Sequence, residues 1–264
     1  MTGVLKEEFS RAFLNKRFGI VILLACISFA YGLSAVGQIQ MDDQALGAVS
    51  LWLIILKQGY YGFFAALMAA LPFADSLIID RRHHFVDQIL MRARYKHYLA
   101  AKICSNVCAG MLAVAGPALI LLLICLSIFT GDGNYQFEIP LGVQEVLNPM
   151  VIEPSSALRM TAPTFVALTT AMLLAFGASY ALLGLAASLV IRDPFVVLGA
   201  PFVCYSVGYY LIPTSRILQW LGSTEAALLP SVNLLSAVLQ YLAMIIVLGL
   251  ALWLWGHKER MLLD

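Results

Sequence analysis

Long apolar runs separated by short polar segments make up most of this chain. Six runs carry at most one charged residue. Each has about 17 residues or more, enough for a helix to cross a bilayer core of about 30 Å. Because an unpaired backbone group is costly in hydrocarbon, each run is expected to be helical. The pattern predicts an all-α, polytopic membrane protein with six transmembrane helices, at about residues 18–38, 50–74, 103–129, 161–191, 195–211 and 232–256.

The polar segments complete the predicted organisation. They are a leader at residues 1–17, a connection at 75–102 and two further loops at 130–160 and 212–231 inside a membrane domain that spans 18–256, and a tail at 257–264. No low-complexity linker separates these parts, so we expect a single membrane unit.

Composition and charge agree with a membrane protein and add an orientation. Hydrophobic residues make up 61% of the chain and charged residues 12%. Lys and Arg gather in alternate polar segments, with four in residues 1–17, six in 75–102, one in 192–194 and two in 257–264. By the positive-inside rule, both termini are expected in the cytoplasm and the chain in a plasma membrane, which for a bacterium is the inner membrane. A net charge of +1 argues against a nucleic-acid partner.

The leader has the pattern of an amphipathic helix. Leu5, Phe9 and Phe13 recur every four residues, with bases and acids on the other faces. Such a helix is expected to lie in the headgroup layer of the bilayer. It could serve as a simple anchor, or as an elbow helix that also touches a cytosolic partner.

The 75–102 segment contains a second amphipathic pattern. Phe85, Ile89 and Leu90 form an apolar strip among charged residues. A short surface helix with an exposed apolar edge is suited to docking into a groove on another protein. The alternative is a solvated loop whose bases bind lipid phosphates.

The stretch DRRHHFVDQILMRARYKHYLAAK, residues 80–102, resembles the first cytoplasmic loop of type-two ABC exporter permeases. It has an acid, an apolar helix, and then Arg94, Tyr98 and Lys102 at a spacing of four before the third span. The six-helix layout and the amphipathic leader are similar too. Asp80 stands where the family usually has Glu, and His84 where Gly is common.

The resemblance implies that this loop is a coupling helix seated on an ABC ATPase subunit, and that two permease copies or paralogues pair with two ATPases. ATP and Mg²⁺ would then bind the partner, since this sequence has no Gly-x-x-x-x-Gly-Lys-Ser/Thr phosphate loop. The implied coupling residues are Asp80, Arg81, Arg82, His84, Phe85, Ile89, Leu90, Arg94, Tyr98 and Lys102.

The most polar positions inside the spans are candidates for lining a pathway. They are Ser28, Tyr31, Ser34, Lys57, Tyr205, Ser206 and Tyr209. Tyrosines near helix ends can instead form the interfacial belt, and serines can bond to neighbouring helices. Lys57, predicted within about two turns of the outer face, could extend to the headgroups or contact a substrate or gate. Gly177, Ala181, Gly184 and Ser188 form a small-residue stripe that predicts close helix packing.

Two other classes of function remain alternatives. A gradient-driven carrier usually has carboxylates near the membrane centre, and no predicted span contains Asp or Glu. An intramembrane enzyme would need a catalytic or metal-binding set. Four histidines are too few for a histidine-rich di-iron site, so no metal site and no catalytic residue is expected in this chain.

Overall fold

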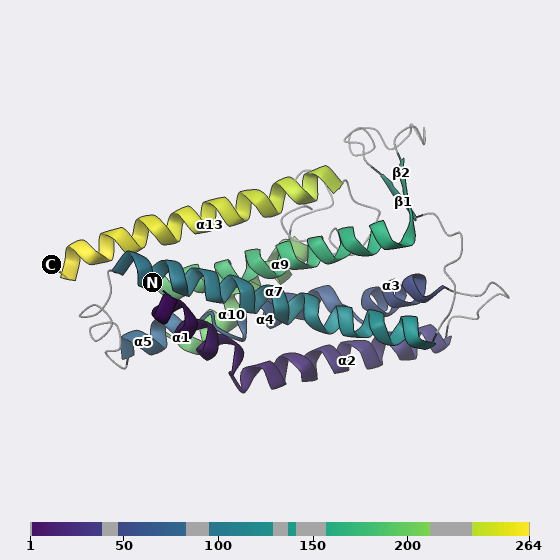
Figure 1. Ribbon diagram of the computed structural model, residues 1–264, viewed down its shortest axis with the longest axis horizontal. Helices are drawn as coiled ribbons and strands as arrows, with labels where there is room; N and C mark the ends of the chain where they lie inside the picture. Colours follow the sequence, from purple (N-terminus) through teal and green to yellow (C-terminus); the bar gives the residue numbers. More distant parts are fainter. Residues whose placement is uncertain are drawn as a thin grey trace.

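The chain folds as a bundle of long helices that run along one axis (Figure 1). The computed structural model describes residues 2–38, 47–82, 95–128, 137–140, 157–211 and 234–263. The helices are α1 (Thr2–Phe13), α2 (Arg17–Gln38), α3 (Ala48–Gln58), α4 (Tyr61–Ala70), α5 (Ser76–Arg82), α7 (Tyr95–Ile128), α9 (Ala162–Val190), α10 (Pro194–Leu211) and α13 (Leu234–Leu263). Two short strands, β1 (Phe137–Pro140) and β2 (Ala157–Met160), pair in an antiparallel sheet.

The two chain termini lie at the same end of the bundle, beside α1 and α5, and the strands lie at the opposite end (Figure 1). We call these the terminal end and the strand end. From the terminal end, α2 and α7 lead away and α9 and α13 return. With α3–α4 returning between α2 and α7, and α10 leading away between α9 and α13, successive segments alternate in direction, as expected of a chain that crosses a layer repeatedly.

Helices α7 and α9 form a closely packed pair. A Cβ atom added at Gly177 would lie 2.6 Å from the carbonyl oxygen of Gly110, so the two backbones touch at these glycines. A Cβ at Gly184 would lie 2.8 Å from the Cβ of Ala74, and Ser188 is fully buried. The predicted small-residue stripe on residues 177–188 is thus confirmed as a packing surface.

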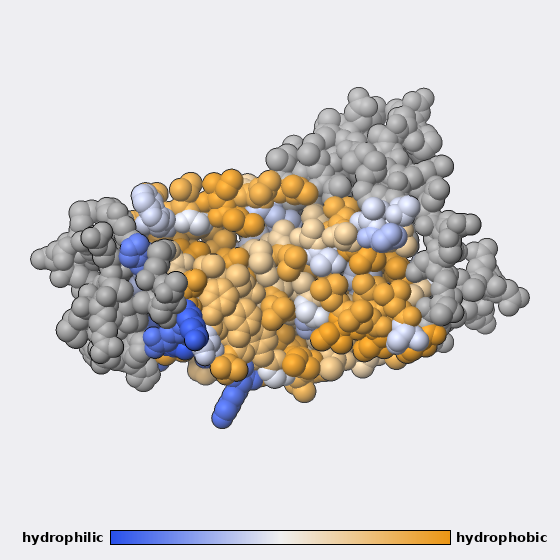
Figure 2. Space-filling view, viewed as in Figure 1, coloured by the Kyte–Doolittle hydropathy of each residue, from blue (hydrophilic) through white to orange (hydrophobic). Residues whose placement is uncertain are grey.

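The middle of the bundle has an apolar exterior. Figure 2 shows a hydrophobic belt between a hydrophilic patch at the terminal end and the strand end. Large apolar side chains are exposed on several helices, such as Leu123, Val247 and Phe195, which is 84% exposed. Contiguous exposed apolar surface of this extent is typical of a membrane protein.

Within the described residues, three helical stretches are long and apolar enough to cross a bilayer, at Arg17–Val36, His97–Ile128 and Ala162–Val190. The bent pair of α3 and α4 would make a fourth. Shorter apolar helices occur at Pro194–Val207 and Gln240–Leu254. These positions agree with predicted spans, and the membrane-protein class follows from them.

The predicted second span, at about 50–74, is wrong as a single helix. It breaks between Gln58 and Tyr61, where α3 and α4 meet at an angle of 75°. Tyr60 adopts the left-handed conformation with φ 49°, which a helix cannot continue. The Oγ of Ser28 on α2 donates a 2.7 Å hydrogen bond to the carbonyl oxygen of Gly59 and so satisfies a backbone group at the break.

The α7 helix begins at Tyr95, eight residues before the predicted third span, so Tyr98 and Lys102 lie on the helix that leads into that span. The all-α expectation is also incomplete, because part of the predicted 130–160 loop forms the β1 and β2 pair, with Phe137 opposite Met160. The rest of the described chain is helical or in short connections.

The connection from α9 to α10 shows why the chain turns there. Asp193 precedes Pro194, and the residue before a proline disfavours the helical conformation. The Oδ1 of Asp193 then accepts a 2.9 Å hydrogen bond from the backbone N–H of Phe195, capping the next helix. A three-residue connection therefore reverses the chain at the terminal end.

Candidate functional site

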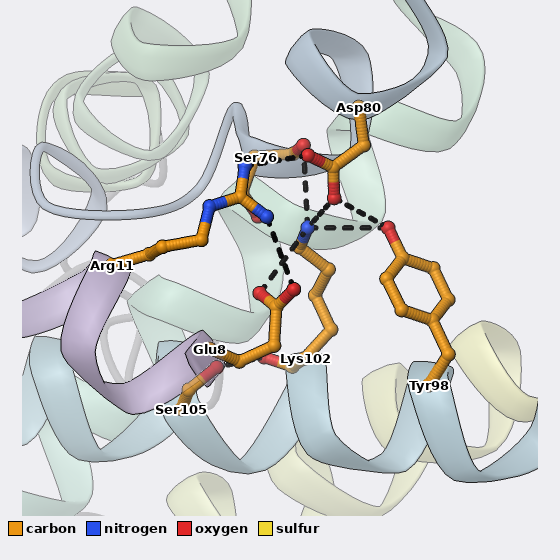
Figure 3. A network of polar contacts seen from close by, with 7 residues as sticks. All are labelled: Glu8, Arg11, Ser76, Asp80, Tyr98, Lys102 and Ser105. Atoms are coloured by element: carbon orange, nitrogen blue, oxygen red, sulfur yellow. Dashed lines mark hydrogen bonds and ion pairs between the residues drawn. The ribbon is translucent and has the colours of Figure 1, made fainter. Parts of the chain in front are cut away.

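A network of buried charged side chains at the terminal end joins three helices that are distant in sequence (Figure 3). Its centre is Lys102 on α7, whose side chain is fully buried. The Nζ of Lys102 donates a short hydrogen bond to Oδ2 of Asp80 on α5. Tyr98, one turn earlier on α7, donates from its hydroxyl to the same oxygen at 2.6 Å. We call this network, with its α1 members below, the terminal cluster.

The amphipathic helix α1 supplies the other half of the terminal cluster. Arg11 donates from Nη2 to Oδ1 of Asp80 at 2.7 Å and from Nη1 to Oε1 of Glu8 at 3.1 Å. The second Glu8 oxygen, Oε2, lies 3.4 Å from the Nζ of Lys102. Two carboxylates and two cations therefore alternate around the site, and their formal charges cancel.

Burial and pairing oppose each other in this cluster. Burial raises the pKa of the Asp80 carboxyl, but Lys102 and the hydrogen bonds from Arg11, Lys102 and Tyr98 outweigh it and hold that pKa below its ordinary value. Burial likewise lowers the pKa of Arg11, and Asp80 and Glu8 reverse the effect. The cluster is thus a set of mutually dependent ions, in which loss of one partner leaves another buried and unpaired.

Aromatic rings complete the surroundings of Lys102. Its Nζ lies 5.3 Å from the ring centroid of Phe73 and 5.0 Å from that of Tyr98. Such cation–π contacts favour a desolvated ammonium group. Phe73 packs in turn with Ala12 of α1 and Ala109 of α7, so the cluster is enclosed by apolar contacts.

A second set of contacts fastens the leader to the end of the broken span. Arg17, at the start of α2, holds Asp75 by two hydrogen bonds, of 2.5 and 2.8 Å. Asn15 donates from Nδ2 to the carbonyl oxygen of Pro72 at 3.0 Å. With the Arg11–Asp80 pair, the leader is held at three points along residues 72–80.

Of the ten predicted coupling residues, the structure brings Asp80, Tyr98 and Lys102 together. All three are buried by the chain itself, so they do not present their side chains to another protein. Tyr98 and Lys102 share one face of α7, as their spacing predicts, and this face packs inward on α1 and α5.

The remaining coupling residues divide between α5 and a part of the chain outside the described residues. Arg82 is exposed and donates to the backbone carbonyl of Arg192 at 3.2 Å, which ties α5 to the α9–α10 connection. Arg81 is half-buried on the same helix. Those outside the described residues are His84, Phe85, Ile89, Leu90 and Arg94.

Sequence reasoning missed the role of Glu8 and Arg11. The apolar face of α1 suggested burial through Leu5, Phe9 and Phe13, but Leu5 is 37% exposed and the two phenylalanines are half-buried. The face that packs against the protein carries Glu8 and Ala12 instead. The available signal was the acid–base pair at i, i+3, with a small residue on the helical turn after Glu8.

The pathway candidates separate into two groups. Ser28 and Tyr31 contact the break between α3 and α4, where the ring centroids of Tyr31 and Tyr60 are 5.8 Å apart. Ser34 lies one turn further along α2 and donates to the backbone carbonyl of Tyr31 at 2.7 Å. Lys57 lies two residues before Gly59 and is exposed.

The second group lies on α10. Tyr205 is buried in the core, with ring centroids of Phe176 and Tyr180 at 6.4 and 6.1 Å, and its pathway-lining role stays a prediction. Ser206 is half-buried, and its Oγ has no hydrogen-bond partner among the described residues. The Tyr209 side chain lies outside the described residues.

The position of Lys57 along the bundle follows from its neighbours. Ser28, which bonds to Gly59, is near the middle of α2, about 16 Å from each end at 1.5 Å per residue. Tyr61, just after the break, donates to the carbonyl oxygen of Val114, near the middle of α7. Lys57 therefore lies near mid-depth, where a lysine costs about 2.5 to 3.5 kcal/mol in a lipid-facing helix.

No group of three or more His, Cys, Asp or Glu side chains that could hold a metal occurs in the parts of the chain that the structure describes. Two of the four histidines, His83 and His84, lie outside those parts. Comparisons of this chain with models of known protein families, with curated proteins and with solved structures found no match.

Proposed function

We propose that this chain is the permease subunit of an ABC transporter, working as an exporter in a plasma membrane with six spans and both termini in the cytoplasm. One observation carries the proposal. The two ends of residues 83–94, at Asp80 and at Tyr98 and Lys102, are fastened to each other and to α1 by the terminal cluster. A coupling loop needs a rigid base of this kind, because force applied to a loose loop is lost in local motion.

In this proposal, residues 83–94 contact a separate ATPase subunit that binds ATP and Mg²⁺. Movement of the loop would be transmitted to α5, which carries Asp80, and to α7, which carries Lys102. The α7 and α9 helices share a backbone contact, so both would respond together. A second permease copy or paralogue would complete the translocation path.

The test is whether a cognate ATPase co-purifies with this chain when the apolar strip is intact and when it carries a charge. Burying one large apolar side chain is worth about 1.5 to 3 kcal/mol, so Phe85→Asp should weaken recovery of the ATPase by about one to two orders of magnitude. Ile39→Asp, the same kind of change between the first two predicted spans, is the matched control. Unchanged ATPase recovery with Phe85→Asp and Ile89→Asp combined would contradict the coupling role of residues 83–94.

A gradient-driven carrier is the second candidate, and the broken α3–α4 pair favours it, since such carriers often bind substrate at broken helices. Against it, none of the six predicted spans contains Asp or Glu. Reconstituted vesicles separate the two. Uptake driven by a proton or sodium gradient without the ATPase would establish the carrier, and strict dependence on ATP would exclude it.

A further inference from the structure

The break between α3 and α4 exposes an unusual group of side chains near mid-depth. Lys57, Gln58, Tyr60 and Tyr31 are all exposed, and Ser34, whose Oγ donates to the backbone carbonyl of Tyr31, is exposed one turn further along α2. Tyr31 is 57% and Tyr60 63% exposed, although their rings contact each other. We call these five residues the midplane patch.

In the part of the chain that the structure describes, the charge of Lys57 has no counter-ion. No carboxylate of the described residues lies within ion-pair distance of its side chain, whereas the buried Lys102 has two. The sequence has no Asp or Glu from 44 to 74, nor in any other predicted span. A second copy of this chain therefore cannot supply a carboxylate from its spans at that depth either.

Lys57 also cannot reach the headgroups easily. Gly59 lies beside Ser28, about 15 Å from the strand end of α2 at 1.5 Å per residue. Lys57 is two residues, or about 3 Å, nearer that end, and the lysine stem covers roughly half of the remaining distance. A cation held at this depth on an exposed face favours an anion brought from outside the chain.

The other members of the midplane patch narrow the kind of anion. The amide of Gln58 and the hydroxyls of Tyr31 and Tyr60 can donate hydrogen bonds to carboxylate or phosphate oxygens. The two tyrosine rings offer apolar surface to a chain or ring attached to that headgroup. Recognition of this type suits an amphipathic anion better than a small hydrated ion.

We propose that the midplane patch binds the carboxylate or phosphate headgroup of an amphipathic anion, with Lys57 as its counter-ion and the two tyrosine rings against its apolar part. This inference rests on the proposed function, because it names the substrate class of the same transporter. The bound headgroup would leave its site when the break between α3 and α4 changes geometry.

The test uses the whole chain in nanodiscs of phosphatidylcholine, without any ATPase. The probes are a photoactivatable fatty acid, which carries a carboxylate, and its methyl ester, which is neutral. The acid should label residues 31–34 and 57–60 saturably. Lys57→Met should lower that labelling by about tenfold or more, as expected for loss of a charged hydrogen bond, and Lys57→Arg should retain it.

Three controls make the result decisive. Labelling by the methyl ester should be the same in the wild type and in Lys57→Met, which also shows that the variant is folded. Lys6→Met, which removes an exposed base of α1, should leave labelling by the acid unchanged. Replacing half of the phosphatidylcholine by phosphatidylglycerol tests whether a bilayer lipid is the occupant.

Equal labelling by the acid in wild type and Lys57→Met would overturn the site, and so would an equal loss of acid and ester labelling. Suppression of the label by phosphatidylglycerol would overturn the assignment to a transported substrate, while unchanged labelling supports it. Because no ATPase is present, these outcomes are independent of ATPase recovery with Phe85→Asp, which tests the proposed function separately.

Discussion

Two lysines in this chain occupy opposite situations. Lys102 is fully buried at the terminal end, between Asp80 and Glu8 and over two aromatic rings. Lys57 is exposed near mid-depth, with no carboxylate partner among the described residues. A buried charge whose partners come from the same chain serves to hold helices together. A charge that is exposed in an apolar belt is available to bind an anion from outside the chain.

The largest effect is expected from Lys102→Met. It removes the cation from the centre of the terminal cluster and leaves the buried Asp80 and Glu8 with Arg11 alone, a change that typically costs about 3 to 5 kcal/mol. We expect a large drop in the thermal unfolding midpoint in detergent, or failure to accumulate. The double variant Asp80→Asn with Lys102→Met should recover part of the loss. Lys57→Met, by contrast, should unfold like the wild type, and equal losses at both lysines would erase the distinction.

The next effect concerns the backbone contact between α7 and α9. Gly177→Ala places a Cβ 2.6 Å from the carbonyl oxygen of Gly110, and overpacking of this kind costs about 1 to 3 kcal/mol. Gly249→Ala is the matched control, because a Cβ there meets nothing within 4 Å. The thermal unfolding midpoint of both variants measures the difference. If they unfold alike, the glycine contact does not organise the bundle.

A pH dependence should distinguish the terminal cluster from the rest of the chain. The pKa of Asp80 is lower in the folded protein than its ordinary value of 3.8, so its ion pairs stabilise the fold above about pH 4. That stability is lost as the pH falls through the folded pKa. The thermal unfolding midpoint of Asp80→Asn should fall less steeply than that of the wild type between about pH 5 and about pH 3. An unchanged slope would assign the acid sensitivity to other carboxylates.

The smallest effect is expected at the break itself. Tyr60→Gly relieves a left-handed backbone conformation but adds chain entropy to the unfolded state, so the two contributions nearly cancel, to within about 1 kcal/mol. The unfolding midpoint should therefore stay close to that of the wild type, while labelling of the midplane patch by the fatty acid falls. A large loss of stability would mean that the Tyr60 ring supports the fold.

The sequence was most informative where one physical effect dominated. Burial of apolar surface fixes the ends of α2 and α9 close to the predicted spans at 18–38 and 161–191. The spacing of Tyr98 and Lys102 placed them on one face, and the small residues from Gly177 to Ser188 marked a real packing surface.

Prediction was poorer where contacts distant in sequence decide the outcome. Whether Lys102 faces water or the protein depends on Glu8 and Asp80, and no local sequence pattern predicts that these residues pair with Lys102. The break after Gln58 is likewise supported by Ser28, 31 residues away from Gly59. Residues 83–94, where the predicted apolar strip lies, remain a prediction.

The bond between Arg11 and Asp80, which joins residues 69 apart, also has a consequence for biogenesis. At about 5 to 20 residues per second, the ribosome supplies Asp80 roughly 3 to 14 s after Arg11. During that interval the N-terminal helix has no docking partner, and its face of Leu5, Phe9 and Phe13 suits it to rest on the bilayer surface. Glu8 can be enclosed only after α7 has been made, so the leader must turn from lipid to protein late in synthesis.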